Sequence, residues 1–537
     1  MRRRQFLRTS SFATFSLAFM AFPGCSPGGK HPERSDGFFP GEKGIGDLQK
    51  AMADGTSSAE KLTQFYLDEI SRIDKKGPAL NAVIKLNPDA LSIARKLDEE
   101  RKSGKLRGPM HGIPILIKDN IDTADKMQTT AGALAMAGNI AGEDAFIVKK
   151  LRDAGAVILG KTNLSEWANF RSTRSSSGWS SRGGQTHNPY VLDRSPCGSS
   201  SGSAVAVAAN LCAVAVGTET DGSIACPASM NNVVGIKPTV GLLSRAGIIP
   251  ISSTQDTAGP FGRTARDAAL LLSAMTGADP DDAVTAKSVN YIQPDYSKFL
   301  DASALKGKRI GIDVSLKKHE GIDALFGKAM EQMKKAGAEF VEVDFMKPNN
   351  DVGGAEFTVL QYEFKAGLNA YLEKAKAPVR SLADVIRFNK EHAKEAMPYF
   401  QQETLESSQA KGDLKSREYT DALAKSTSVR GAIDKILKEH RLDALLGPAT
   451  GTPWCIDPVN GDFWTGYGGY GPAAVAGYPS VTVPMGFLDG LPAGLSFIAS
   501  AWEEGKLIAL AYAYEQVSKN RKAPGFKRTV ITNQLTV

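Results

Sequence analysis

The sequence is poor in cysteine, in histidine and in long apolar runs. It holds five cysteines and six histidines in 537 residues. No two cysteines have the CxxC spacing of zinc ribbons and thioredoxin-like redox sites, so neither class is indicated. The four cysteines in the body of the chain are too few and too scattered for a disulfide scaffold, and we expect them to be buried free thiols. The five positions are Cys25, Cys197, Cys212, Cys226 and Cys455.

The chain also lacks a strong excess of charge of one sign. Its formal net charge is +7, but four arginines fall within the first eight residues, and removal of residues 1–24 leaves +3. Proteins that bind nucleic acid need a basic surface to neutralise phosphates, so no nucleic-acid partner is indicated. With 42% hydrophobic and 23% charged residues, the body of the chain has the composition of an ordinary globular protein.

The first 24 residues have the pattern of an export signal. Residues 3–7 (RRQFL) match the twin-arginine pattern, and the apolar stretch 12–22 that follows is too short to span a bilayer. Residues 22–25 (FPGC) resemble a lipoprotein cleavage box, although the residue three positions before Cys25 is usually leucine. Ordinary signal-peptide cleavage, with Cys25 incidental, is the alternative. We expect an exported protein, either periplasmic or tethered to the bacterial envelope by lipid on Cys25.

Beyond the signal, the chain divides into a tether and one α/β domain. Residues 25–42 are rich in proline, glycine and serine and are predicted to be a flexible tether. Short apolar runs then alternate with helix-periodic segments, which favours a mixed or mainly parallel central sheet flanked by helices on both faces. We expect an α/β domain over 43–525 and a C-terminal tail over 526–537. Residues 354–440 are charged and helix-periodic, and are predicted to be a helical insertion over one edge of the sheet. The strands are expected at residues 113–117, 156–159, 212–216, 233–236, 309–312, 444–446, 480–483 and 495–498.

Two segments of small polar residues depart from ordinary core composition. Residues 195–203 (SPCGSSSGS) run directly into an apolar helix, which favours exposed N–H groups and hydroxyls at a helix start over a flexible linker. Residues 217–224 (GTETDGSI) follow an apolar strand, where α/β proteins usually place reacting groups. Gly222 would let the backbone there approach a ligand closely. The alternative for this second segment is an ordinary turn capped by Asp221.

A reactive serine needs a base, and Lys118 is the candidate. It ends the apolar run 113–117, so its stem would emerge from a buried strand. Loss of hydration disfavours the ammonium form and lowers the pKa from about 10.4. A neutral amine can accept a proton from a serine, whereas a solvated ammonium cannot. The alternative is a lysine paired with the adjacent Asp119.

A competing motif points to a different serine. Residues 198–202 (GSSSG) match the GxSxG nucleophile elbow of α/β-hydrolases, which would make Ser200 the nucleophile of an esterase. That mechanism requires a histidine later in the chain. The three downstream histidines, at positions 319, 392 and 440, lie in charged, helix-like sequence that is typical of solvated faces. The esterase is therefore the weaker alternative.

Together these segments resemble the amidase signature family. Residues 111–120 (HGIPILIKDN) resemble its catalytic-lysine motif, residues 198–200 its serine- and glycine-rich signature, and residues 217–252 its nucleophile segment. The resemblance runs from about residue 45 to about residue 520. Within the family, the Asp-Gly-Ser at 221–223 and the segment 160–172 (GKTNLSEWANFRS) resemble the peptide-amidase branch, which removes C-terminal amides.

The resemblance implies a carboxamide hydrolase that forms an acyl-enzyme and needs no metal and no cofactor. Ser223 becomes the nucleophile, Lys118 the base, and Ser199 the bridging serine, which follows a cis peptide bond from Gly198. The oxyanion hole would be formed by the backbone N–H groups of Thr220, Asp221, Gly222 and Ser223.

Substrate contacts are expected from Gly198, Trp167 and Phe170, although buried core is the ordinary place for the two aromatic side chains. The expected partner is a small-molecule or peptide amide. An exported binding lipoprotein that has lost activity is an alternative from another class, against which the presence of all three relay residues counts. The amidotransferase subunit that acts on charged transfer RNA is a further relative, disfavoured by the export signal and the absence of a basic face.

Overall fold

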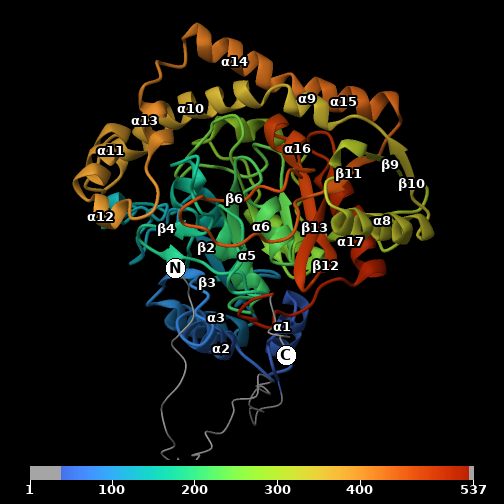
Figure 1. Ribbon diagram of the computed structural model, residues 1–537. Helices are drawn as coiled ribbons and strands as arrows, with labels where there is room; N and C mark the ends of the chain where they lie inside the picture. The colour runs from blue at the N-terminus through green and yellow to red at the C-terminus, as the bar shows by residue number, and fades with distance from the viewer. Residues whose placement is uncertain (1–37, 531–537) are drawn as a thin grey trace, which may run out of the picture. The chain divides into compact units, whose positions relative to one another are not determined.

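An eleven-stranded mixed β-sheet runs through the centre of the protein, whose computed structural model describes residues 38–530 (Figure 1). All eight predicted strands are present, and β1, β8 and β10 were not predicted. The strands of the sheet are β1 (Val83–Leu86), β2 (Pro114–Lys118), β3 (Val157–Thr162), β6 (Val214–Glu219), β7 (Val234–Lys237), β8 (Thr257–Gly262), β9 (Arg309–Ile312), β10 (Glu339–Glu342), β11 (Ala444–Pro448), β12 (Ser480–Leu488) and β13 (Leu491–Ile498). A separate short hairpin pairs β4 (Trp179–Ser180) with β5 (Gly184–Gln185).

The sheet has two parallel groups of three strands on either side of an antiparallel middle, and its edge strand β1 pairs antiparallel with β3. Its order is β1-β3-β2-β6-β8-β7-β12-β13-β11-β9-β10. β3, β2 and β6 run parallel to one another, as do β11, β9 and β10. Every neighbouring pair from β6 to β11 is antiparallel. One cause is local: Asp489 and Gly490, both at positive φ, form a two-residue turn that joins β12 to β13 as a hairpin. A mixed sheet is confirmed, and a mainly parallel one is wrong.

Helices flank the sheet, as predicted. α5 and α6 pack together against it, and α7 and α17 form a second packed group on it. α2 begins where the sequence offers a cap, since the Ser58 hydroxyl accepts a hydrogen bond from Lys61 N–H. The helices outside residues 353–439 are α1 (Ile45–Ala53), α2 (Ala59–Glu69), α3 (Ala90–Lys102), α4 (Phe146–Asp153), α5 (Ser201–Ala208), α6 (Ala225–Met230), α7 (Ala265–Met275), α8 (Glu320–Lys335), α9 (Met346–Asn350), α16 (Gly471–Ala476) and α17 (Glu504–Ser518).

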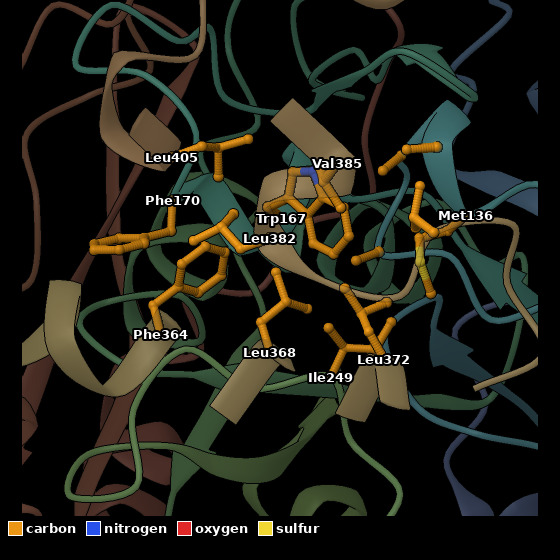
Figure 2. Close-up of a cluster of buried hydrophobic side chains, with 14 of the residues drawn as sticks. Met136, Trp167, Phe170, Ile249, Phe364, Leu368, Leu372, Leu382, Val385 and Leu405 are labelled. Atoms are coloured by element: carbon orange, nitrogen blue, oxygen red, sulfur yellow. The ribbon is translucent and has the colours of Figure 1, made fainter. Parts of the chain in front are cut away.

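Residues 353–439 form a helical layer across one end of the sheet (Figure 1). Its long helix α10 contacts the loops that follow β2 and β3 and the loop that precedes β8, so the layer covers strand ends rather than one edge. Aromatic and aliphatic side chains of α10 and α11 bury themselves against these loops (Figure 2). The layer consists of α10 (Gly353–Lys374), α11 (Leu382–Glu391), α12 (Ala393–Ala396), α13 (Glu403–Gln409), α14 (Arg417–Thr427) and α15 (Val429–Glu439).

Two of the cysteines form a disulfide, so the expectation of free thiols is wrong for them. Cys197 and Cys226 are bonded, with their Cα atoms 6.0 Å apart and a separation of 29 residues in the sequence. Cys212 is free and buried, as expected, whereas Cys455 is free but exposed. A pair so far apart in sequence, and without a motif, is recognised only once the fold brings its members together.

The predicted export signal (residues 1–24) and Cys25 lie outside the described residues. At the end of the predicted tether, the Phe39 ring packs edge-on against Phe65. In the predicted C-terminal tail, the backbone of Lys527 forms an isolated parallel β-bridge with Val191. Within residues 38–530, the structure holds no helix with the length and apolar character that a bilayer crossing requires.

Candidate active site

Lys118 places its amine in a fully buried pocket beneath the loop that follows β6. It is the last residue of β2, a strand in which every residue is buried. Its Nζ lies 2.7 Å from Ser199 Oγ, 2.8 Å from Thr218 Oγ1 and 3.0 Å from Ser200 Oγ. A fourth contact, of 3.2 Å, reaches the Thr218 carbonyl oxygen. The amine is therefore surrounded by neutral oxygens, with no carboxylate in contact.

Burial gives this lysine an unusual pKa. Desolvation lowers the pKa of Lys118 from 10.5 to about 7, although the negative charges of Asp256 and Glu219 act in the opposite direction. The alternative, in which Lys118 pairs with Asp119, is not what the structure shows, because the Asp119 carboxylate contacts Thr130 and Arg182 instead. Near neutral pH about half of such amines are uncharged and able to accept a proton.

The hydrogen bonds around the amine distinguish Ser199 from Ser200. Ser200 Oγ donates to the Thr218 carbonyl at 2.9 Å and accepts from the Thr218 N–H at 3.1 Å, so its one proton is already committed. Ser199 Oγ has no such acceptor among the described residues apart from the amine. The Gly198–Ser199 peptide bond is cis. Gly198 packs so closely on Ser165 that a Cβ would lie 2.2 Å from the Ser165 hydroxyl.

Ser223 sits on the loop that joins β6 to α6, with 7% of its surface exposed. Gly222, which precedes it, has a φ of +74°, and a Cβ there would lie 2.4 Å from the Tyr470 hydroxyl. Both facts require glycine. The Glu219 carboxylate fixes the far end of this loop, because it accepts hydrogen bonds from Ile224 N–H at 2.7 Å and Ala225 N–H at 2.9 Å.

The loop leaves a row of backbone N–H groups without partners. Among the hydrogen bonds of residues 38–530, none is donated by the N–H groups of residues 220–223. Unpaired N–H groups that converge beside a nucleophile can stabilise an oxyanion, and one such donor is worth roughly 10²–10³ in rate. Four consecutive N–H groups, those of residues 220–223, are therefore available to bind an acceptor.

The structure forms one link of the predicted relay and leaves the other open. Lys118 contacts Ser199, but no hydrogen bond joins Ser199 Oγ to Ser223 Oγ among the described residues. The two serine segments are nevertheless tied, since Ser200 N–H donates to the Ser223 carbonyl at 3.2 Å. Catalytic hydrogen bonds are often loose in enzymes without substrate and tighten when it binds.

Ser200 is poorly placed to be a nucleophile. It is fully buried and its hydroxyl is bonded to Thr218 and Lys118. The downstream histidines do not serve it as a base. His319 caps the start of α8 and His392 stacks on the Phe388 ring, and within the described chain none of the three contacts a serine hydroxyl.

Two cavities border the loop that joins β6 to α6 and carries Ser223, called the nucleophile loop below. One of about 390 Å³ is lined by Thr218 and Thr220 and extends under α10. The other, of about 380 Å³, is lined by Asp221 and Tyr470. Asp221 is exposed to this cavity, yet protein surrounds it on most sides. Burial, together with the Glu356 and Glu219 carboxylates, therefore raises the pKa of Asp221 well above its usual value.

The predicted aromatic substrate contacts lie elsewhere. Trp167, 1% exposed, and Phe170, 7% exposed, pack in the hydrophobic cluster with Phe364 and Leu368 of α10 (Figure 2). Neither lines the two cavities beside the nucleophile loop, although their neighbour Ala168 lines the larger one. The structure thus gives Trp167 and Phe170 the core position that is ordinary for aromatic side chains.

Several residues of the site were not predicted. Thr218 binds the lysine amine and also accepts a hydrogen bond from Asn120 Nδ2 at 3.0 Å. Asp256 anchors the other end of the loop, because Thr220 Oγ1 donates to its carboxylate at 2.5 Å. Thr218 and Glu219 stand within the predicted nucleophile segment, so the signal was present. Asp256 is a contact that only the fold reveals. Across residues 38–530, no group of three or more His, Cys, Asp or Glu side chains is arranged to hold a metal ion.

The mixed sheet thus carries a buried lysine amine and, beside it, two serine-rich segments that are hydrogen-bonded to each other. The sequence profile of the family described as Amidase matches residues 61–508. The chain belongs to this amidase signature family, and it is a hydrolase that acts on amide C–N bonds.

Individual relatives agree with this assignment. A protein described as a probable amidase from Arabidopsis thaliana is 43% identical, covering 90% of this chain and 92% of that protein. The crystal structure of native peptide amidase from Stenotrophomonas maltophilia is similar with a TM-score of 0.85 and 52% identity, covering 91% of this chain and 99% of that one. A putative amidase from Schizosaccharomyces pombe is 38% identical, covering 91% of this chain and 87% of that protein.

Proposed function

We propose that this protein hydrolyses carboxamides through an acyl-enzyme on Ser223, with Ser199 and Lys118 as the proton relay. One observation carries the proposal: a fully buried amine, with its pKa lowered to about 7, lies 2.7 Å from Ser199 Oγ. That amine can be uncharged at neutral pH, so it can serve as a base where no histidine is available.

The proposed reaction moves one proton along two hydroxyls and back. Neutral Lys118 takes the Ser199 proton as Ser199 takes the Ser223 proton, and Ser223 Oγ attacks the amide carbon. The unpaired N–H groups of residues 220–223 stabilise the oxyanion of the tetrahedral intermediate. The relay returns the proton to the leaving nitrogen, and ammonia departs. Water then attacks the ester by the same path, which releases the carboxylate and restores Ser223.

Peptide C-terminal amides are the proposed substrates, with small carboxamides as the alternative. The similarity to a peptide amidase supports this choice, and a similar structure at 52% identity is described as that enzyme with the competitive inhibitor chymostatin. Two cavities of about 390 and 380 Å³ beside the nucleophile loop also offer room for groups larger than a simple amide.

The test is to locate the reactive serine. A fluorophosphonate probe followed by peptide mapping should place the adduct on Ser223, and Ser223→Ala should abolish ammonia release from a peptide amide. Ser200→Ala is the matched control, and it should retain labelling at Ser223. An adduct on Ser200, or full turnover by Ser223→Ala, contradicts the mechanism. A folded wild-type protein that released no ammonia from any peptide, aliphatic or aryl amide would instead support the inactive binding lipoprotein.

We also propose that the chain is exported, on the strength of the twin-arginine pattern at residues 3–7. Fractionation of a bacterium that expresses the full chain should place the protein in the periplasm or the membrane fraction. Replacement of Arg3 and Arg4 by lysine should retain it in the cytoplasm. Loss of the membrane-bound pool in Cys25→Ala would identify Cys25 as the lipidated residue.

A further inference from the structure

The disulfide joins the two segments that carry the catalytic serines. Cys197 lies two residues before Ser199, and Cys226 lies three residues after Ser223. Both cysteines are buried, with 5% and 2% of their surfaces exposed. Their bond therefore acts inside the protein, next to the reacting groups, and not at a surface loop.

Two hydrogen bonds flank this covalent link. On one side, Ser200 N–H donates to the Ser223 carbonyl at 3.2 Å. On the other, Asn231 Nδ2 donates to the Pro196 carbonyl at 2.8 Å. The disulfide thus lies between two hydrogen bonds that hold the start of α5 against α6. It is the covalent one of these three links, and a hydrogen bond is far easier to break.

The backbone at Cys197 is in a conformation that its neighbours must hold. Its φ is +56°, in the left-handed region that side chains with a Cβ rarely adopt. The Cys197 carbonyl accepts from Ser201 Oγ at 2.6 Å, and its N–H donates to Ser195 Oγ at 3.1 Å. Relaxation of this residue would be passed directly to Ser199, only two positions along the chain.

The lysine is held by other means. Thr218 binds its amine through both Oγ1 and the carbonyl oxygen, and Ser200, which also contacts the amine, is fixed by two hydrogen bonds to the Thr218 backbone. Loss of the disulfide would consequently leave Lys118 in place and loosen Ser199 relative to Ser223.

We propose that the Cys197–Cys226 disulfide is a positioning element of the active site, which holds Ser199 where it can pass a proton between Ser223 and Lys118. This inference rests on the proposed function. It makes the chemical step, and not substrate binding, depend on the disulfide. A misplacement of about 1 Å in a catalytic group can cost on the order of 10²-fold in rate.

The first experiment compares two double variants of the full chain. Cys197→Ala/Cys226→Ala removes the disulfide, and Cys212→Ala/Cys455→Ala is the matched control that removes the two free thiols. Each is assayed well below its melting temperature, and its functional sites are counted by exhaustive fluorophosphonate labelling. We expect kcat per labelled site to fall about 10- to 100-fold without the disulfide, with KM within about twofold of the wild-type value. The pH dependence should keep its midpoint, because Lys118 is unmoved.

A purely structural role predicts a different result. Partial unfolding reduces the number of labelled sites but leaves kcat per site unchanged. The proposal is overturned if kcat per labelled site stays within twofold of the wild-type value, or if KM alone changes.

A second experiment covers the case in which the double variant does not fold. The native wild-type protein is reduced with a water-soluble trialkylphosphine, which becomes its oxide by taking oxygen from water while two cysteine thiols form. Activity should fall in proportion to the thiols gained at Cys197 and Cys226. Complete reduction with full activity overturns the proposal. The oxidised protein provides the baseline: if it releases no ammonia, the proposed function has failed, and not the inference about the disulfide.

Discussion

The pH dependence of hydrolysis follows from the burial of Lys118. The neutral amine is the active form, so kcat/KM should rise with pH until the amine is fully deprotonated. With a pKa of about 7, half of the enzyme is active at pH 7. About one tenth is active at pH 6 and about one hundredth at pH 5. A lysine that kept its pKa of 10.5 would be neutral in only about one molecule in 3,000 at pH 7.

The assay measures ammonia release from an N-acetylated peptide amide that has no group titrating between pH 5 and 9. We expect log(kcat/KM) to rise with unit slope below pH 7 and to level off above it. The rise of log(kcat/KM) below pH 7, the acid limb, could also come from ionisation of the Asp256 carboxyl, because burial raises the pKa of Asp256 to about 6. Asp256→Asn separates the two. Removal of its negative charge favours the neutral amine, so the midpoint should move to lower pH if Lys118 is responsible. Disappearance of the limb in this variant, or a midpoint near 10, would refute the reasoning.

Three further predictions concern the residues around the relay. Thr218→Val removes the Oγ1 that accepts from Lys118, and kcat should fall about 5- to 50-fold by steady-state assay, whereas Thr218→Ser should retain most activity. Gly222→Ala combines a φ of +74° with a Cβ 2.4 Å from the Tyr470 hydroxyl, so urea unfolding should show a loss of at least about 1–3 kcal/mol. Gly46→Ala, at the exposed start of α1, where a Cβ would meet nothing within 4 Å, should cause no such loss, and equal effects at both sites would contradict this account. The unfolded chain keeps the Lys118 proton up to about pH 10.5 and the folded chain only to about pH 7. Between these pH values the free energy of unfolding should therefore rise with pH by about 1.4 kcal/mol per pH unit, relative to that of Lys118→Met. Parallel curves for the two proteins would argue against it.

Apolar runs were sufficient to place most of the sheet. Eight strands were predicted because each contains a short apolar run. β8 was missed because its sequence, TAGPFG, contains two glycines and a proline, which are typical of a turn. Edge strands β1 and β10 were missed because they are half-exposed and carry lysine or glutamate. Strand direction could not be predicted, since the same periodicity serves parallel and antiparallel pairing.

The site was predictable where chemistry depends on local sequence. An apolar strand that ends in lysine already implies desolvation, and the structure bears this out for Lys118. Contacts between distant segments were beyond that reasoning. Thr218 binds an amine 100 positions away, and Cys226 bonds a cysteine 29 positions away, and neither pairing has a motif. The aromatic contacts assigned to Trp167 and Phe170 show the same limit, because only the packing of α10 against them reveals a core position.

The most direct test observes the amine itself. A pH titration of the Lys118 side chain by ¹³Cε and ¹⁵Nζ nuclear magnetic resonance, with its signal assigned by its absence in Lys118→Met, reports the protonation state without relying on turnover. The account predicts a midpoint close to pH 7 in the folded protein. A midpoint near 10.5 would mean that the amine is charged at working pH, and the proposed relay could not then begin.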